Sequence, residues 1–256
     1  QRPAQLFDGV LQRLSIFITN KQNTDHTIYT TGINRWYTET RNNLFCLLSY
    51  VESPQSYQPH FVKLGSKIEV NIFNKYVTHI PIRNYIGLSE DYSNSLYYRT
   101  AGGGYWVTFL NAEFDCVSVS NKHTVIRDDI VAKALSAALN SNLFWWYYSI
   151  NFDLFNFKDY MIFGFQFTYT DKTTLSNIIK LSDQMEISLR ENAVYYSINS
   201  ATNGLNETVT YQKFKSKDIM DTIDKELKKI YNFTDEELDF IINYDIKYRM
   251  GDELNE

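Results

Sequence analysis

The clearest helical pattern of the sequence lies in DDIVAKALSAALNSNLFWWYY, which runs from Asp128 to Tyr148. Its first half repeats apolar residues at helical spacing from Ile130 onward, and Asp128 or Asp129 can cap the helix. Its second half contains four consecutive aromatic residues, Trp145 to Tyr148, which cannot all share one helix face. We expect two or three of these rings in the core and the remainder exposed or facing a partner.

Apolar residues recur at helical spacing in five other segments of the chain. These are residues 34–51, 66–77, 173–191, 217–230 and 235–249. Two of the segments begin with the spacing of a capping box, Ser66 with Glu69 and Thr234 with Glu237. We expect a helix over each of the five.

Short runs of β-branched and aromatic residues predict strands. They cover residues 14–19, 27–31, 96–100, 105–109, 115–119, 123–126, 163–169 and 211–214. The first run is typical of a buried strand, and the second of its hairpin return. Residues 101–104, Ala-Gly-Gly-Gly, predict a turn that joins 96–100 to 105–109. Helices and strands together predict an α+β fold.

The composition indicates a folded chain of one large or two small domains. Of its 256 residues, 44% are hydrophobic and 21% charged, which excludes bulk disorder, collagen and coiled coil. The net charge is −5, and residues 217–256 alone hold 6 basic and 12 acidic residues. A polyanionic partner would therefore need a local basic patch. The most apolar stretch, residues 143–169, carries polar and charged side chains and predicts no membrane span.

Known catalytic motifs are missing from the sequence. None of the four prolines are adjacent, so no Asn-Pro-Pro-aromatic motif exists, and no strand leads through a spaced glycine turn into a helix. The four histidines lack metal-ligand spacing. We therefore name no catalytic residue and no metal ligand. The two cysteines, Cys46 and Cys116, form no CxxC and point to a reducing compartment.

Several segments share a pattern with one protein family. They are residues 2–10 (RPAQLFDGV), 12–18 (QRLSIFI), 98–106 (YRTAGGGYW), 141–146 (SNLFWW) and 234–251 (TDEELDFIINYDIKYRMG). The chain thereby resembles the C-terminal part of N6-adenine DNA methyltransferases from type IIG/IIS restriction–modification systems, with their TaqI-like specificity domain. It departs from them in lacking the methyl-donor loop and the Asn-Pro-Pro-aromatic motif. It also has Asn151–Phe155 where members often carry a Ser-Asp-x-Arg turn.

The resemblance implies three parts. Residues 1–50 would end the methyltransferase domain as a hairpin and linking helix, 51–215 would form a mixed target-recognition domain, and 216–256 an acidic helical segment. The implied partners are double-stranded DNA and the upstream methyltransferase domain of the same polypeptide, with no membrane, in the bacterial cytoplasm. The fragment itself would hold no cofactor, whereas the parent would use S-adenosylmethionine to methylate a flipped adenine. Whether the parent also cleaves DNA is left open.

The hairpin around residues 99–106 is the first candidate for DNA contact, because a two-stranded ribbon fits the major groove and arginine pairs with guanine or phosphate. The same residues also suit an ordinary turn whose aromatics fill the core. The polar loop at 120–123, the aromatic run and the first helix supply further candidates. The full candidate set is Arg35, Arg41, Arg99, Thr100, Gly102, Gly103, Gly104, Tyr105, Trp106, Asn121, Lys122, Asn142 and Trp145.

Three other functions fit parts of the sequence. A protein–protein docking module without DNA binding suits the negative net charge and the many aromatics. A binder of glycans or other neutral polymers would use tyrosine-rich sheets but has no motif. An enzyme with a novel site would need clustered titratable groups, which the scattered histidines do not favour.

Overall fold

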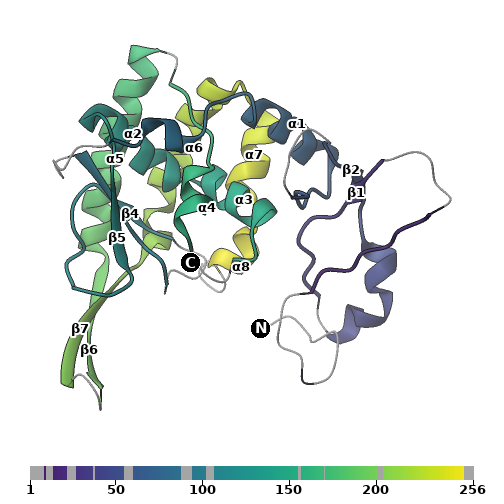
Figure 1. Ribbon diagram of the computed structural model, residues 1–256, viewed down its shortest axis with the longest axis horizontal. Helices are drawn as coiled ribbons and strands as arrows, with labels where there is room; N and C mark the ends of the chain where they lie inside the picture. Colours follow the sequence, from purple (N-terminus) through teal and green to yellow (C-terminus); the bar gives the residue numbers. More distant parts are fainter. Residues whose placement is uncertain are drawn as a thin grey trace. The chain divides into compact units, whose positions relative to one another are not determined.

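The computed structural model describes residues 9, 14–21, 27–36, 38–54, 60–87, 94–101, 107–154, 157–169, 171–200 and 204–250, without the side chains of 198–200 and 204–206. These residues form both helices and sheets, which confirms the α+β class (Figure 1). The chain divides into two compact units, residues 1–74 with 149–153, and residues 75–148 with 154–256. In the described part of the chain, no helix has the length and apolar character needed to cross a membrane.

The first unit contains a two-stranded sheet and the start of a helix. Its elements are β1 (Tyr29–Thr30), the 3-10 helix η1 (Thr38–Leu47), β2 (Val51–Glu52) and the beginning of α1 (Lys67–Tyr76). Half of the expected capping box of α1 is present: the Ser66 hydroxyl accepts from Glu69 N, while the Glu69 carboxylate accepts from Gly65 N at 2.8 Å, one residue before the cap. A Cβ on Gly65 would lie 2.6 Å from the backbone nitrogen of Gly32, so this close approach requires glycine.

One expectation for this unit is wrong and another holds in part. Residues 14–19 do not form a buried strand, because every one of them is exposed, with Ile18 at 90%. The strand β1 pairs instead with β2, placing Tyr29 opposite Glu52. The helix expected over 34–51 is present over Thr38–Leu47 as the 3-10 helix η1, in which Leu44 is the buried residue. Regular helices owe most of their stability to a packed apolar face, and η1 has almost none.

The second unit contains a three-stranded antiparallel sheet in the order β4-β3-β5. Its strands are β3 (Ser95–Arg99), β4 (Phe109–Leu110) and β5 (Asn121–Val125). The expected strands at 96–100 and 123–126 are confirmed. The first two residues of the expected strand at 105–109 lie outside the described residues, and its last residue, Phe109, pairs with Tyr98. The expected strand at 115–119 is wrong. Those residues form a bend and a loop without strand pairing, and two valines of this loop, Val117 and Val119, lie fully exposed.

The segment 128–148 forms two helices, α2 (Asp129–Leu139) and α3 (Asn142–Asn151), rather than one. Asp128 caps α2 as expected, accepting from Val131 N at 3.2 Å. The break occurs at Asn140, whose side chain donates to Phe109 O at 2.7 Å and accepts from Phe109 N at 3.2 Å. Ser141 Oγ then accepts from Phe144 N and starts α3. The expectation of an exposed aromatic ring is wrong: the residues from Trp145 to Tyr148 are at most 4% exposed. A helix that is apolar all round is buried all round.

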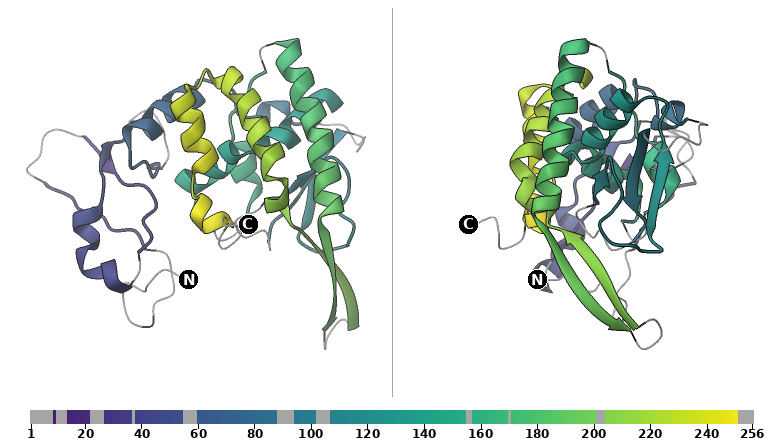
Figure 2. Two further views of the ribbon diagram at one scale, coloured as in Figure 1. Left: turned by 180° about the vertical axis from the view of Figure 1, so that it is seen from behind. Right: turned by 90° about the vertical axis from the view of Figure 1, so that its left-hand side faces the viewer.

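Further helices complete the second unit. They are η2 (Ile82–Tyr85), α4 (Asp159–Phe163), α5 (Lys172–Glu191), η4 (Lys213–Ser216), α6 (Lys217–Tyr231), α7 (Asp235–Asn243) and α8 (Ile246–Met250). Helix α2 packs on β3 and β4 and also on α5, and α5 packs on α6, so helices form layers on one face of the sheet (Figure 2). The Thr234–Glu237 capping box is confirmed. The expected strand at 163–169 is wrong, since it makes only one isolated bridge, between Gln166 and Pro81.

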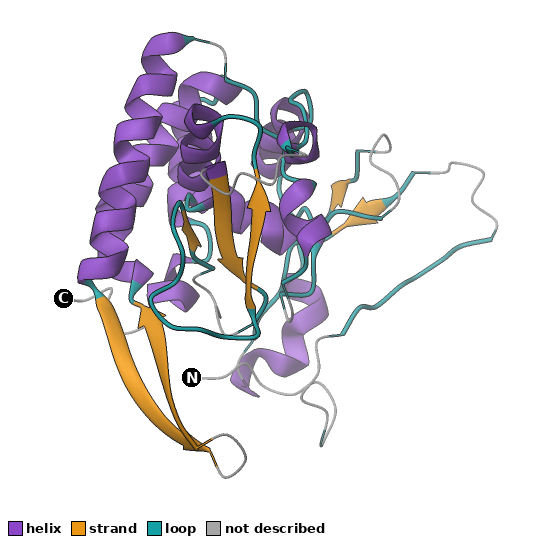
Figure 3. Ribbon diagram, turned by 60° about the vertical axis from the view of Figure 1, so that its left-hand side comes forward, coloured by secondary structure: helices purple, strands orange, loops and turns teal. Residues whose placement is uncertain are grey.

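A long β-ribbon follows α5. It consists of β6 (Ala193–Ser200) and β7 (Gly204–Tyr211), paired antiparallel along their whole length. Figure 3 shows the ribbon projecting from the helices of the second unit. The expected strand at 211–214 is wrong beyond Tyr211, because η4 begins at Lys213. The sequence between the two strands contains an Asn-Gly pair at 203–204, which favours a hairpin.

Candidate nucleic-acid interface

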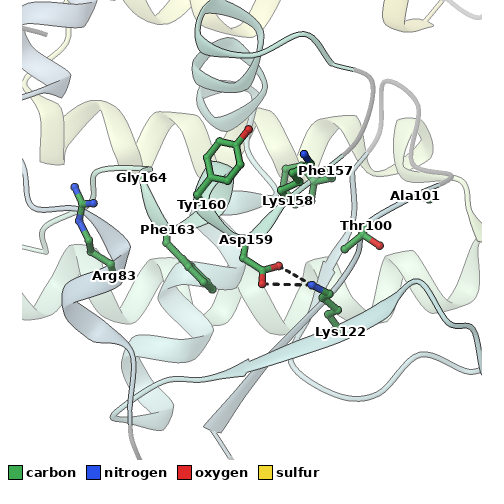
Figure 4. A pocket seen from close by; sticks show the side chains of 10 residues that line it. All are labelled: Arg83, Thr100, Ala101, Lys122, Phe157, Lys158, Asp159, Tyr160, Phe163 and Gly164. Carbon is green, nitrogen blue, oxygen red and sulfur yellow. Dashed lines mark hydrogen bonds and ion pairs between the residues drawn. The ribbon is translucent and has the colours of Figure 1, made fainter. Parts of the chain in front are cut away.

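A cavity of 820 Å³ opens on the second unit (Figure 4). Segments far apart in the sequence build it: η2, the end of β3, β5, and α4 with the residues just before it. Its lining residues are Arg83, Thr100, Ala101, Lys122, Phe157, Lys158, Asp159, Tyr160, Phe163 and Gly164. The lining therefore combines three cations, one acid and three aromatic rings.

The acid of the cavity is already bound to one of the cations. Lys122 Nζ lies 3.2 Å from Asp159 Oδ1, and the two side chains are 48% and 45% exposed. Tyr98, from the buried face of β3, donates its hydroxyl to Asp159 Oδ1 at 3.0 Å. Burial raises the pKa of Tyr98 to about 12, so the hydroxyl remains a donor at neutral pH. The uncharged Tyr98 hydroxyl thus holds the Asp159 carboxylate next to Lys122.

The other two cations lack an acidic partner among the residues that the structure describes. Arg83 comes from η2, and Lys158 precedes α4; neither makes an ion pair there. Both are exposed, as is Tyr160 at 60%. With Lys122 and Asp159 offsetting each other, the cavity carries two uncompensated positive charges beside aromatic surface. This combination suits an anion attached to a ring, as in a nucleic acid.

Two residues of the candidate set, Thr100 and Lys122, line this cavity. Arg99 does not, because its side chain points into the protein. Arg99 Nε donates to Asn121 Oδ1 at 2.8 Å and NH1 donates to Val209 O at 2.6 Å, and the guanidinium lies 4.6 Å from the ring centroid of Phe114. Asn121 in turn donates to Cys116 O at 2.9 Å. Arg99 and Asn121 therefore join β3 and β5 to the ribbon.

Asn142 and Trp145 are buried, at 0% and 4% exposure, so neither offers a surface to DNA in this conformation. Asn142 accepts from Arg249 NH1 at 2.7 Å and donates to the carboxylate of Asp224 at 2.8 Å. The Arg249 guanidinium also lies 5.4 Å from the ring centroid of Trp145. Burial raises the pKa of Asp224 to about 6 and lowers that of Arg249 to about 10. Asn142, Asp224 and Arg249 therefore stabilise the first turn of α3 rather than a binding surface.

The remaining candidates lie elsewhere. Arg35 and Arg41 are partly exposed residues of the first unit, on or just before η1. Gly102, Gly103, Gly104, Tyr105 and Trp106 lie outside the described residues. Within the described ranges, no group of three His, Cys, Asp or Glu side chains is placed to hold a metal ion.

The sequence predicts two of the ten lining residues as DNA contacts; among the others are three charged residues and one exposed tyrosine, Arg83, Lys158, Asp159 and Tyr160. Arg83 lies just after Pro81 in a short segment without any motif, and the other three lie in the apolar stretch 143–169, where Lys158 and Asp159 argue only against a membrane span. No local pattern marks them, because the cavity exists only where η2, β5 and α4 meet. Comparisons with protein-family models, curated proteins and solved structures found no match to the chain.

Proposed function

We propose that this chain binds duplex DNA as the target-recognition region of an N6-adenine DNA methyltransferase from a restriction–modification system. The observation that carries the proposal is the cavity in which neither Arg83 nor Lys158 pairs with an acid among the described residues. The segments around Tyr98–Trp106 and Thr234–Gly251, which resemble that family, support the same conclusion. Methylation itself would belong to an upstream domain, which would hold S-adenosylmethionine.

The cavity suits the DNA backbone for an electrostatic reason. Each phosphate that a lysine or arginine neutralises releases condensed counterions, and this release drives binding. Arg83 and Lys158 can each take a phosphate without losing an internal partner. Lys122 can exchange as well, since an exposed ion pair such as Lys122–Asp159 contributes only about 0–1 kcal/mol. The exposed ring of Tyr160 adds a surface for a sugar or base.

The exposed apolar segment at residues 14–20 supports the part of the proposal in which a further protein domain contacts this chain. Ile16, Phe17 and Ile18 are 56%, 78% and 90% exposed, although β-branched and aromatic residues in such a run favour a sheet. A strand of another domain would cover them and pair with their backbone. The family resemblance predicts that residues 1–50, which include this segment, form the end of the methyltransferase domain.

The proposal is tested by titrating the chain with fluorescent duplex DNA at several salt concentrations. Affinity should fall steeply with salt, and the double variant Arg83→Ala/Lys158→Ala should lower the log–log slope by about 2, because each lost phosphate contact removes about 0.9. The control Lys172→Ala/Lys180→Ala removes the same charge from the exposed face of α5 and should leave the slope unchanged. Salt-independent binding, or equal behaviour of the two double variants, would exclude DNA binding at this cavity.

A protein–protein docking function is the second candidate. It is favoured by the fully exposed Val117 and Val119 in the loop between β4 and β5. Apolar contacts respond little to salt, so tight binding to a protein with a flat salt dependence, and no binding to duplex DNA, would support this alternative.

A further inference from the structure

The ribbon β6–β7 is the second surface feature of the unit that carries the cavity. Each strand has eight residues, which corresponds to a length of about 26 Å, and Figure 3 shows it standing away from the helices. Residues 193–211 include a single charged residue, Glu207. An isolated two-stranded ribbon is marginally stable in water, so a projecting one of this length calls for an explanation.

The base of the ribbon is fixed to the body by hydrogen bonds. The Asp115 carboxylate accepts from the hydroxyls of Tyr195 at 3.1 Å and Tyr211 at 3.0 Å, and it pairs with Arg190. On β7, the strand that also contains Tyr211, Val209 O accepts from Arg99. These contacts set the direction in which the ribbon leaves the sheet.

The same contacts connect the ribbon with the cavity. Arg99, which binds the ribbon, is followed directly by Thr100, a lining residue of the cavity. Asn121, which binds Arg99, is followed by Lys122, another lining residue. The basic cavity and the base of the ribbon therefore share the end of β3 and the start of β5. A duplex held by its phosphates at the cavity would lie next to the ribbon.

The two faces of the ribbon differ. Val209 and Tyr211 are buried, on the face that packs against the body near Asp115; Tyr195 on the same face is 56% exposed, and its hydroxyl is bound to Asp115. The opposite face carries the cross-strand pairs Val194–Thr210 and Tyr196–Thr208. Tyr196 is 49% exposed and Thr210 is exposed, so hydroxyl groups line this outward face near its base. Glu207 lies on the other face, opposite Ser197.

We infer that the ribbon enters the major groove of the bound duplex and reads base edges with its outward face; this inference rests on the proposed function. A major groove about 12 Å wide admits a two-stranded ribbon. Neutral hydroxyls form hydrogen bonds with base edges but add no general attraction for phosphate, so they contribute selectivity rather than affinity. The cavity would supply the affinity, and the ribbon the selectivity.

The test is selection of bound duplexes from a random-sequence pool, using the whole chain. The triple variant Tyr196→Phe/Thr208→Val/Thr210→Val removes three hydroxyls yet keeps residues that favour strands. It should lower the enrichment of the preferred sequence about tenfold or more, while affinity for unselected DNA and the salt slope stay unchanged. The control Thr173→Val/Thr222→Val removes exposed hydroxyls from α5 and α6 and should keep the preference.

A second variant, Thr208→Glu/Thr210→Glu, places two carboxylates on the outward face and should weaken binding to every duplex by charge repulsion. If the wild-type chain binds DNA with a sequence preference and the triple variant keeps that preference, the ribbon is not the reader and the proposed function stands. If the wild-type chain binds DNA with salt dependence but without any preference, both the inference and target recognition by this chain fail. If the wild-type chain fails to bind duplex DNA, the proposed function fails. Pairing of a partner's strand with β6 or β7 in place of DNA would also overturn the inference.

Discussion

Replacing Asp224 by alanine should destabilise the second unit more than any surface substitution on α6. The Asp224 carboxylate is 2% exposed and accepts from Asn142 N at 3.0 Å and Leu143 N at 3.1 Å. These are first-turn N–H groups of α3, which have no partner within the helix. A helix start that is buried this deeply depends on the carboxylate supplied by α6.

The magnitude follows from the groups that the substitution would leave behind. Two buried N–H groups would lose their acceptor, at about 1–3 kcal/mol each. Arg249, which is 5% exposed, would lose a nearby negative charge. Removing one member of a buried charged network costs about 3–5 kcal/mol. We expect the lower end, about 3 kcal/mol, because the variant no longer buries a carboxylate whose pKa burial raises to about 6.

The assay is equilibrium unfolding in urea at pH 7, followed by tryptophan fluorescence, since Trp145 and Trp146 lie on α3. Asp218→Ala is the matched control: it removes an exposed carboxylate from the first turn of the same helix and should cost less than about 1 kcal/mol. A loss below about 1 kcal/mol for Asp224→Ala would show that α3 does not depend on this cap.

Three further outcomes concern polar groups of the second unit. The pKa of Asp224 is raised from 3.8 to about 6, so the folded state binds this proton more tightly than the unfolded chain does. The stability linked to the proton is therefore full below pH 4 and falls by about 3 kcal/mol up to pH 6. The variant Asp224→Asn should abolish this loss in urea titrations across pH. Asp115→Ala should cost about 1–3 kcal/mol and speed proteolysis of the ribbon, because two tyrosines and an arginine lose their acceptor; unchanged cleavage would contradict the anchoring role. Burial lowers the pKa of Lys213 well below its usual value, which shows that burying this ammonium group is costly. The variant Lys213→Met should therefore leave the melting temperature equal or higher. A large drop in melting temperature would mean that the hydrogen bond from Lys213 to Val107 O outweighs the cost of burial.

Local sequence signals were sufficient for several elements. The Asp128 cap, the Thr234 capping box and the helices α5 and α6 depend on residues within one or two turns, so their spacing reveals them. The break at Asn140 has no such signal, because its side chain binds Phe109, 31 positions away. The ribbon had a local signal in the sequence, the Asn-Gly pair at 203–204, which is typical of a hairpin.

Some residues of the candidate site could likewise be predicted from the sequence, and others could not. From the sequence, Lys122 and Thr100 could be proposed as DNA contacts, and the structure places both at the cavity. Arg99 was as good a candidate by residue type, yet folding brings it against Val209, 110 positions later, and it becomes an internal link.

The sequence by itself determined where α2 and α7 begin and that no known catalytic motif is present, because these properties depend on neighbours within a few residues. Only the tertiary structure decided which cations of the described residues pair internally. Arg83 and Lys158 stand 75 positions apart in the chain, and their meeting in one cavity, where no described acid pairs with either, depends on how η2, β5 and α4 pack. Charge pairing depends on distance in space, which local sequence patterns do not specify.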